Sequence, residues 1–154
     1  MENNNYFAIY ETELGLIKIE YEDNTITSIL KTKSQFKGYP TEFTDMVYRE
    51  LKDYINKRRK SFDFNYQLIG TEFQKKVWTE LLKIPYGETR SYKEVAINIG
   101  NSKAARAVGM ACNKNPIIVM VPCHRVIGSN GGLTGYAGGL SMKQDLLDIE
   151  QNSI

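Results

Sequence analysis

The sequence is poor in the residues that build disulfide frameworks and metal sites. It contains two cysteines, Cys112 and Cys123, and a single histidine, His124. These residues cannot supply a disulfide network or a four-ligand zinc site, so we expect no metal and no cofactor. Because the chain has few thiols and needs no disulfide framework, it suits a reducing compartment. We therefore expect a cytoplasmic protein.

Long apolar runs and a large charge excess are also absent. No segment approaches the about 20 consecutive apolar residues of a membrane-spanning helix. The polar start, Met1–Asn5, does not resemble a secretory signal, and we expect no membrane association. A formal net charge of +2 on 154 residues is too small to indicate a nucleic-acid partner. Any DNA-binding surface must therefore come from a local cluster of basic residues.

The first part of the chain, residues 1–68, predicts a small α/β domain. Three segments alternate or run apolar with short polar connections between them, which predicts an antiparallel meander. These segments are residues 6–10, 16–21 and 26–30. Apolar residues then recur at helical spacing from Phe43 to Ile55.

Two further segments of this part have weaker signals. The basic run Lys57–Lys60 suits the C-terminal end of a helix. We interpret it as a solvated helix end and keep a DNA contact as the alternative. Residues 62–66 alternate, and we expect them to return to the sheet.

The second part, residues 69–154, predicts a mainly α domain. Thr71 with Gln74 and Ser91 with Glu94 have the spacing of capping boxes at the starts of two helices. We expect Ser102 to cap a third helix that ends at Ala111 or Cys112. The second and third helices are joined by Gly100-Asn101, so they predict a helix-turn-helix.

The third predicted helix combines small side chains with two cations. Small residues allow close approach to another surface, and packing within the core would explain Ala107, Val108 and Ala111. Arg106 does not fit that explanation. DNA binding by this helix is therefore a candidate function. The residues that would carry it are Ser102, Lys103, Ala104, Ala105 and Arg106.

The stretch Val121–Val126 places a thiol, an imidazole and a guanidinium side by side. It follows Pro116–Val121, which predicts a buried extended segment, and it precedes several glycines. Cys123 is thus a candidate nucleophile if its pKa, about 8.5 in a free cysteine, is lowered. The alternative is an inert buried cysteine, which is the commoner case.

The last predicted helix starts at Ser141, with Gln144 at the capping-box position. Met142, Leu146 and Ile149 would form its inner face. Glu150, close to the end of the helix, would ordinarily be a solvated charge.

Three motifs together resemble the O6-alkylguanine-DNA alkyltransferases, which move an alkyl group from a damaged base onto their own cysteine. They are Pro122–Val126, Gly135-Tyr136 downstream and Arg106–Gly109 upstream. The resemblance covers roughly residues 70 to 150. It implies a ribonuclease-H-like domain over residues 1–68 and a winged helix-turn-helix domain over 69–154.

The resemblance also implies roles for the reacting groups. Cys123 would take the alkyl group, His124 would accept its proton directly or through water, and Glu150 would hold the imidazole. The Tyr92 hydroxyl would donate a hydrogen bond to the leaving oxygen, O6 of the guanine. Asn115 would buttress the helix-turn-helix and position the thiol.

A second set of residues would hold the DNA and the damaged base. Arg106 would fill the stack vacated by a flipped nucleotide. Tyr136, Val126 and Gly138 would line the base pocket. Ala137 stands where some relatives have serine, which leaves the substrate range open.

The implied partner is double-stranded DNA that carries O6-alkylguanine, bound by a monomer that reacts once and irreversibly. Activity on O4-alkylthymine stays open. Two other functions remain: a DNA-binding module in which Cys123 is silent, and a cysteine hydrolase that uses Cys123, His124 and Glu150.

Overall fold

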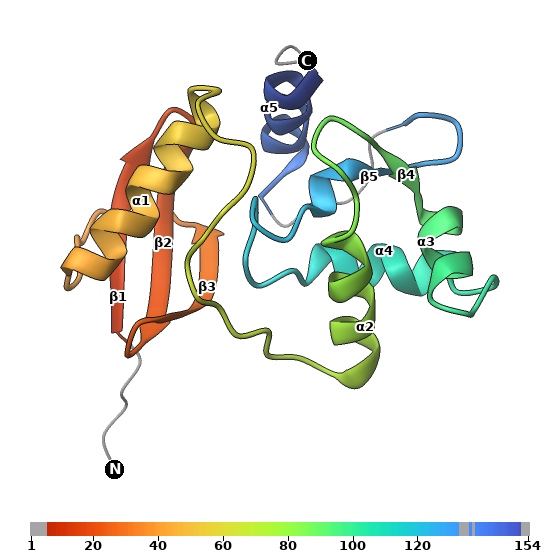
Figure 1. The fold of residues 1–154 in the computed structure, drawn as a ribbon, viewed down its shortest axis with the longest axis horizontal. Coiled ribbons are helices and arrows are strands. Elements are labelled where there is room, and N and C mark those ends of the chain that lie inside the picture. Colours follow the sequence, from red (N-terminus) through yellow and green to blue (C-terminus); the bar gives the residue numbers. More distant parts are fainter. Residues whose placement is uncertain (1–5, 133–135, 137, 152–154) are drawn as a thin grey trace. The chain divides into compact units, whose positions relative to one another are not determined.

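The computed structural model describes residues 6–132, 136 and 138–151 (Figure 1). The chain divides into two compact units, residues 1–68 (unit 1) and residues 69–154 (unit 2). Within the described residues, no helix has the length and apolar character needed to cross a membrane.

Unit 1 is built on a three-stranded antiparallel sheet in the order β1-β2-β3. The strands are β1 (Tyr6–Thr12), β2 (Gly15–Glu22) and β3 (Thr25–Lys31), which confirms the predicted meander. Ala8, Ile19 and Ile29 lie in register across the sheet and are fully buried. Since side chains alternate along a strand, this row defines the face that carries the core.

Helix α1 (Glu42–Ile55) covers one face of this sheet, as Figure 1 shows, and confirms the helical periodicity of the sequence. Thr41 caps its first turn through a capping box with Thr44. The Tyr10 hydroxyl lies 2.8 Å from Thr44 Oγ1 and donates to Asp45 Oδ1 at 2.6 Å, which fixes the helix start on β1.

Both edges of the sheet are paired with loop segments. Gly38 forms an isolated antiparallel bridge with Ala8 of β1, and Tyr66 forms a parallel bridge with Ile26 of β3. Residues 62–66 therefore return to the sheet as predicted, but through one bridge rather than a strand. Covered edges are protected from pairing with other chains.

Unit 2 is mainly helical. Its helices are α2 (Glu72–Leu81), α3 (Tyr92–Asn98), α4 (Ala105–Asn113) and α5 (Leu140–Gln151), with a short 3-10 helix η1 at Cys123–Arg125. Strands β4 (Arg90–Ser91) and β5 (Val126–Ile127) form a two-stranded parallel sheet. The capping boxes of Thr71 with Gln74 and of Ser91 with Glu94 are both present, which confirms these two predicted helix starts.

Two predicted helix starts were wrong. Helix α4 begins at Ala105, not after Ser102, because residues 101–104 form a turn in which Ala104 donates its N–H to the Asn101 carbonyl at 3.0 Å. Helix α5 begins at Leu140, so Ser141 and Gln144 lie inside it and Ser141 is not the residue that precedes the helix. The Gln144 amide instead donates to Asp148 at 2.8 Å.

Two further predictions for unit 2 were also wrong. Ala107 is exposed and not part of the core. The segment Pro116–Val121 is buried at most positions but is not extended, because Val121 donates its N–H to the Ile117 carbonyl at 3.0 Å and closes a turn.

Candidate active site

A tight turn brings Cys123 to the centre of unit 2. Val119, within the turn from Ile117 to Val121, has a φ of +75°, a strained value for a β-branched residue. Pro122 follows and has no N–H to donate. The chain then enters η1, which carries the thiol. Helices α2 and α5 both contact η1. The site is thus built on a buried, irregular segment that two helices support.

Asn115 ties this turn to the thiol. Its side-chain amide donates to the Val121 carbonyl at 2.8 Å and to Cys123 Sγ at 3.1 Å. Its side-chain oxygen accepts the N–H of Ile117 at 2.9 Å. Every part of the amide group is therefore engaged, and the predicted pairing of Asn115 with Cys123 is present in the geometry.

The thiol of Cys123 is only 1% exposed. Burial raises its pKa to about 12, although the Asn115 hydrogen bond and the nearby ammonium of Lys143 act in the opposite direction. This contradicts our expectation of a lowered pKa, because removal of water disfavours the thiolate more than the neighbours favour it. In the unbound protein Cys123 is a neutral thiol.

His124 and Glu150 form a fully buried pair, with Nε2 of the imidazole 2.7 Å from Oε2 of the carboxylate. A carboxylate accepts hydrogen bonds, so this contact places a proton on Nε2 and leaves Nδ1 as the basic nitrogen. Burial lowers the pKa of His124, and the carboxylate of Glu150 opposes that effect. Glu150 is therefore not the solvated charge that its place near the helix end would ordinarily make it, and its predicted pairing with His124 is present in the geometry.

Arg125 is a member of this cluster to which the sequence analysis, although it noted the guanidinium beside the thiol, assigned no role. Its Nε donates to Oε1 of Glu150 at 2.8 Å and its Nη2 donates to Oε2 at 2.9 Å. Its Nη1 donates to the Ile84 carbonyl at 2.6 Å. Such a two-pronged contact compensates the buried carboxylate charge and fixes its plane. One carboxylate therefore serves both the imidazole and the guanidinium.

Lys143 is a second residue that the sequence analysis missed. Its side chain is fully buried, and Nζ donates to the Val126 carbonyl at 2.6 Å and to the Tyr92 hydroxyl at 3.2 Å. Two residues with predicted roles, Tyr92 and Val126, thus share a single donor. Lys143 and Glu150 are seven residues apart on α5, a spacing that puts both on one helix face and could have revealed the pair.

Tyr136 is buried, and Gly138 lies tightly against it. A Cβ added at Gly138 would lie 2.9 Å from Cε2 of Tyr136 and 2.5 Å from Sδ of Met142. No side chain fits there without displacing one of these neighbours. Ala137, which we also predicted to line the base pocket, lies outside the described residues.

The exposed face of α4 is distinct from this buried cluster. Arg106 and Ala107 are exposed, Met110 is 67% exposed, and Lys103 is exposed in the turn before the helix. Ser102 is also exposed in that turn. Ala104 is buried, so we remove its side chain from the predicted DNA surface, and Ala105 is half-buried.

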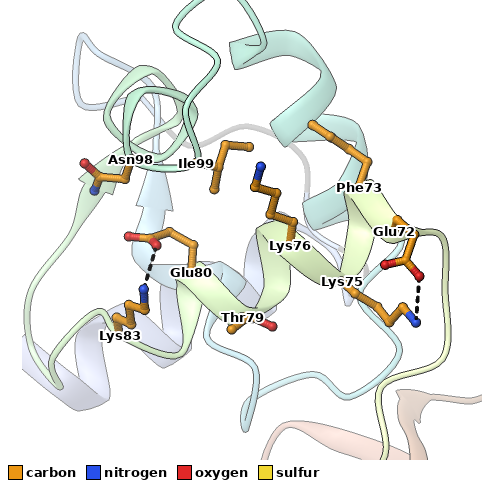
Figure 2. A pocket seen from close by; sticks show the side chains of 9 residues that line it. All are labelled: Glu72, Phe73, Lys75, Lys76, Thr79, Glu80, Lys83, Asn98 and Ile99. Atoms are coloured by element: carbon orange, nitrogen blue, oxygen red, sulfur yellow. Dashed lines mark ion pairs between the residues drawn. The ribbon is translucent and has the colours of Figure 1, made fainter.

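An open groove of about 710 Å³ lies on α2 and on the end of α3 (Figure 2). Its lining carries two ion pairs, between Lys75 and Glu72 and between Lys83 and Glu80. Its lining contains no cysteine and none of the predicted site residues. The chemistry of unit 2 therefore lies in the buried cluster.

Comparisons with known proteins show which family the chain resembles. Residues 72–152 match the family model for the DNA-binding domain of 6-O-methylguanine DNA methyltransferase. The methylated-DNA–protein-cysteine methyltransferase of Methanosarcina acetivorans is 47% identical over 152 residues, which covers 94% of this chain and 97% of that protein. The constitutive enzyme of Bacillus subtilis is 39% identical, with 97% of both chains covered.

Solved structures show the same likeness over the whole chain. The crystal structure of Mycobacterium tuberculosis OGT in complex with DNA matches with a TM-score of 0.87 and 40% identity, covering 96% of this chain and 93% of that one. The mixed α/β fold described above is therefore shared with a protein that has been crystallised on DNA.

Proposed function

This chain belongs to the 6-O-methylguanine DNA methyltransferase family, and from that premise we propose that Cys123 is the residue that takes the alkyl group. The activity is that of the family, DNA repair by alkyl transfer to a cysteine of the protein. One observation carries the assignment to Cys123. Its thiol is held by Asn115 and is followed in sequence by the buried His124–Glu150 pair.

The transfer breaks one bond and forms one. The sulfur of Cys123 attacks the alkyl carbon of O6-alkylguanine, and the carbon–oxygen bond breaks with its electron pair going to the base. The base then takes one proton and becomes guanine. The thiol proton passes to His124, directly or through one water, and from there to solvent. The alkyl group is not removed from the resulting thioether, so each protein molecule reacts once.

The pKa values in the unbound protein indicate when the thiolate forms. A thiol with a pKa of about 12 and an imidazole with a lowered pKa are both neutral near pH 7. We infer that the proton moves only when the base occupies the site and its alkyl carbon is in reach. The Glu150 carboxylate, held by Arg125, then stabilises the imidazolium.

DNA recognition is assigned to the helix-turn-helix of α3 and α4. The exposed Arg106, Lys103 and Ser102 form the contact surface, and Arg106 enters the stack that the flipped nucleotide vacates. Flipping is required because the reacting carbon is inaccessible within a duplex. Tyr92, Tyr136 and the Val126 carbonyl would contact the flipped base.

The finer description of the fold is part of the same proposal. We assign residues 1–68 to a ribonuclease-H-like domain and residues 69–154 to a winged helix-turn-helix domain that carries the transfer. We further propose a monomer that acts in the cytoplasm, where two free thiols stay reduced.

Intact mass measurement tests the proposal. The purified protein is mixed with a duplex that contains O6-methylguanine, and we expect a gain of one methyl group per chain without turnover. Cys123→Ala should bind the duplex and gain nothing, whereas Cys112→Ala, which changes a buried thiol in α4, should still be methylated. A methyl group mapped to Cys112, or tight binding without transfer by the unchanged protein, would refute the assignment.

A further inference from the structure

The turn that follows α2 supplies the carboxylate of Glu150 with a main-chain donor. The backbone N–H of Gly87 lies 3.1 Å from Oε1 of Glu150 and donates to it. Glu150 is fully buried, and a buried carboxylate needs hydrogen bonds in place of the water that it has lost. Gly87 therefore adds a backbone contact to those that His124 and Arg125 make with the same group.

The backbone of this turn directs the N–H of Gly87 toward the carboxylate. Gly87 has a φ of +83°, in the left-handed region that favours glycine. Glu88 closes the turn by donating its N–H to the Pro85 carbonyl at 3.1 Å. The turn lies at the surface, since Pro85 and Glu88 are exposed, and surface connections are the more mobile parts of a fold. The direction of the Gly87 N–H therefore depends on the contacts that hold the turn.

Helix α5 holds the turn from the residue next to Glu150. Gln151 donates from Nε2 to the Gly87 carbonyl at 2.8 Å. Consecutive residues of a helix point about 100° apart, so Gln151 and Glu150 contact Gly87 from two directions. The ring of Tyr86 adds a further contact, because the Arg125 guanidinium lies 5.7 Å from its centre.

The contact of Gln151 differs from that of another exposed glutamine on the same helix. Gln144 donates to Asp148, one turn along α5, at 2.8 Å. Such a contact lies within the helix and serves the helix alone. Gln151 is also exposed, but it bonds a backbone carbonyl 64 residues earlier, in the residue that donates to Glu150. Its hydrogen bond therefore links the end of α5 to the group that holds the imidazole.

We propose that Gln151 is a positioning residue for the transfer: through the Gly87 peptide it keeps the carboxylate of Glu150 in the orientation that binds the imidazole. The proposal rests on the proposed function, in which His124 takes the proton of Cys123. Gln151 touches no reacting atom and moves no proton. A carboxylate that is already oriented needs no reorganisation when the imidazolium forms.

Three substitutions of Gln151 separate the loss of a hydrogen-bond donor from the loss of a side chain. Gln151→Ala should slow single-turnover transfer from a saturating O6-methylguanine duplex about fivefold, the effect of one ordinary hydrogen bond. Gln151→Glu keeps the length of the side chain, but its carboxylate only accepts hydrogen bonds, so transfer should be at least as slow. Gln151→Arg provides a donor again and should restore the rate to within about twofold.

The imidazole of His124 gives a second measurement that needs no DNA. His124 is the only histidine in the chain, so a histidine-labelled protein gives a single set of imidazole signals in nuclear magnetic resonance. The proton on Nε2, shared with Glu150 at 2.7 Å, should give a strongly downfield signal. In Gln151→Ala and Gln151→Glu it should move upfield and exchange faster with water. In Gln151→Arg it should return.

Gln144→Ala is the matched control, because it removes the side chain of the other exposed glutamine of α5. Its transfer rate and its histidine signal should equal those of the unchanged protein. Circular dichroism confirms that each variant is folded. Equal losses in Gln144→Ala and Gln151→Ala would show a general disturbance of α5 and would overturn the proposal.

Each remaining outcome contradicts a defined step. Slower transfer with an unchanged histidine signal would show that Gln151 does not act through Glu150. A shifted signal with an unchanged rate would show that this orientation does not limit transfer. Failure of Gln151→Arg to restore either quantity would show that the donor is not the cause. If the unchanged protein gained no methyl group, the proposed function itself would be refuted, whereas the histidine signal would still decide whether Gln151 orients Glu150.

Discussion

Among the described residues of unit 1, the interior is apolar apart from Thr44 and Glu50, whereas unit 2 buries an amide, an imidazole, a guanidinium, an ammonium and a carboxylate. The two polar groups of unit 1 serve local structure. Thr44 completes the capping box of α1, and Glu50 accepts the N–H of Asp63 at 2.8 Å. The polar groups of unit 2 converge on Cys123 and on the residues around it.

This difference matters because buried charges cost free energy that an apolar core does not. An ion pair inside a protein is often no more stabilising than apolar side chains of the same shape. Unit 1 shows that this chain can build a core with few such groups. The cluster of Arg125, Glu150, His124 and Lys143 therefore indicates function and not a requirement of folding. Substitutions of comparable groups in the two units test this comparison.

The largest contrast is expected between Glu150→Gln and Glu50→Gln, two neutralised buried carboxylates. Glu150→Gln leaves Arg125 buried without its counter-charge, which should cost about 3–5 kcal/mol of unfolding free energy. It should also slow single-turnover transfer about 100-fold, the lower range for loss of general-base support. Because the thiol pKa is about 12, this deficit should persist up to pH 9. Urea unfolding and rapid-quench transfer assays give the two quantities.

Glu50→Gln provides the control within unit 1. It should lower the unfolding free energy by about 1–3 kcal/mol, because a buried N–H loses a charged acceptor. The transfer rate of the folded protein should not change. A similar slowing in both variants would remove the functional distinction between the two units.

Arg106→Ala and Arg58→Ala compare two exposed arginines, one on α4 and one in the basic run after α1. We expect Arg106→Ala to weaken transfer from a paired lesion by about tenfold, since nucleotide flipping costs a few kcal/mol. A mispaired lesion should restore part of the loss because it flips more easily. Binding should keep most of its salt dependence, which reports phosphate contacts.

Arg58→Ala should leave the transfer rate unchanged on both duplexes, if the basic run is a solvated helix end. Transfer assays with paired and mispaired O6-methylguanine decide the matter. Equal losses for Arg106→Ala on the two duplexes would contradict its role in flipping. A loss for Arg58→Ala would favour the alternative that the basic run contacts DNA.

Methylation should destabilise unit 2 and leave unit 1 unaffected. Cys123 is buried and its sulfur accepts a hydrogen bond from Asn115 at 3.1 Å. A methyl group on the sulfur takes up space in a close-packed region, and such overpacking costs about 1–3 kcal/mol. The melting temperature should fall after quantitative methylation, and hydrogen exchange should accelerate in residues 115–126. An unchanged or raised melting temperature would contradict this prediction.

The smallest effect is a pH dependence of stability that belongs to unit 2, since unit 1 contains no histidine. Burial lowers the pKa of His124 in the folded protein, so the unfolded chain binds more protons below its ordinary pKa of about 6.5. Stability should be complete above that pH and decrease as the pH falls. The slope cannot exceed about 1.4 kcal/mol per pH unit for one group. Urea titrations from pH 7.5 to pH 5.5 measure it, and His124→Gln should flatten it.

Local patterns in the sequence were sufficient for most elements of the fold. The three strands, α1, and the starts of α2 and α3 follow from alternation, helical periodicity and capping boxes, which act between residues close in the chain. The start of α4 and the course of residues 116–121 were predicted wrongly. Both depend on turns closed by backbone hydrogen bonds, and side-chain patterns do not encode these turns directly.

The sequence by itself determined which groups can react: one thiol beside the only imidazole, in a motif that resembles a known family. Only the tertiary structure decided how these groups are charged and paired. It buries Cys123 and raises its pKa, it turns Glu150 inward to both His124 and Arg125, and it places Lys143 against Tyr92. Burial and long-range pairing depend on how helix α5 packs against segments whose paired residues lie 25 to 51 positions earlier in the chain, and no local pattern specifies those contacts.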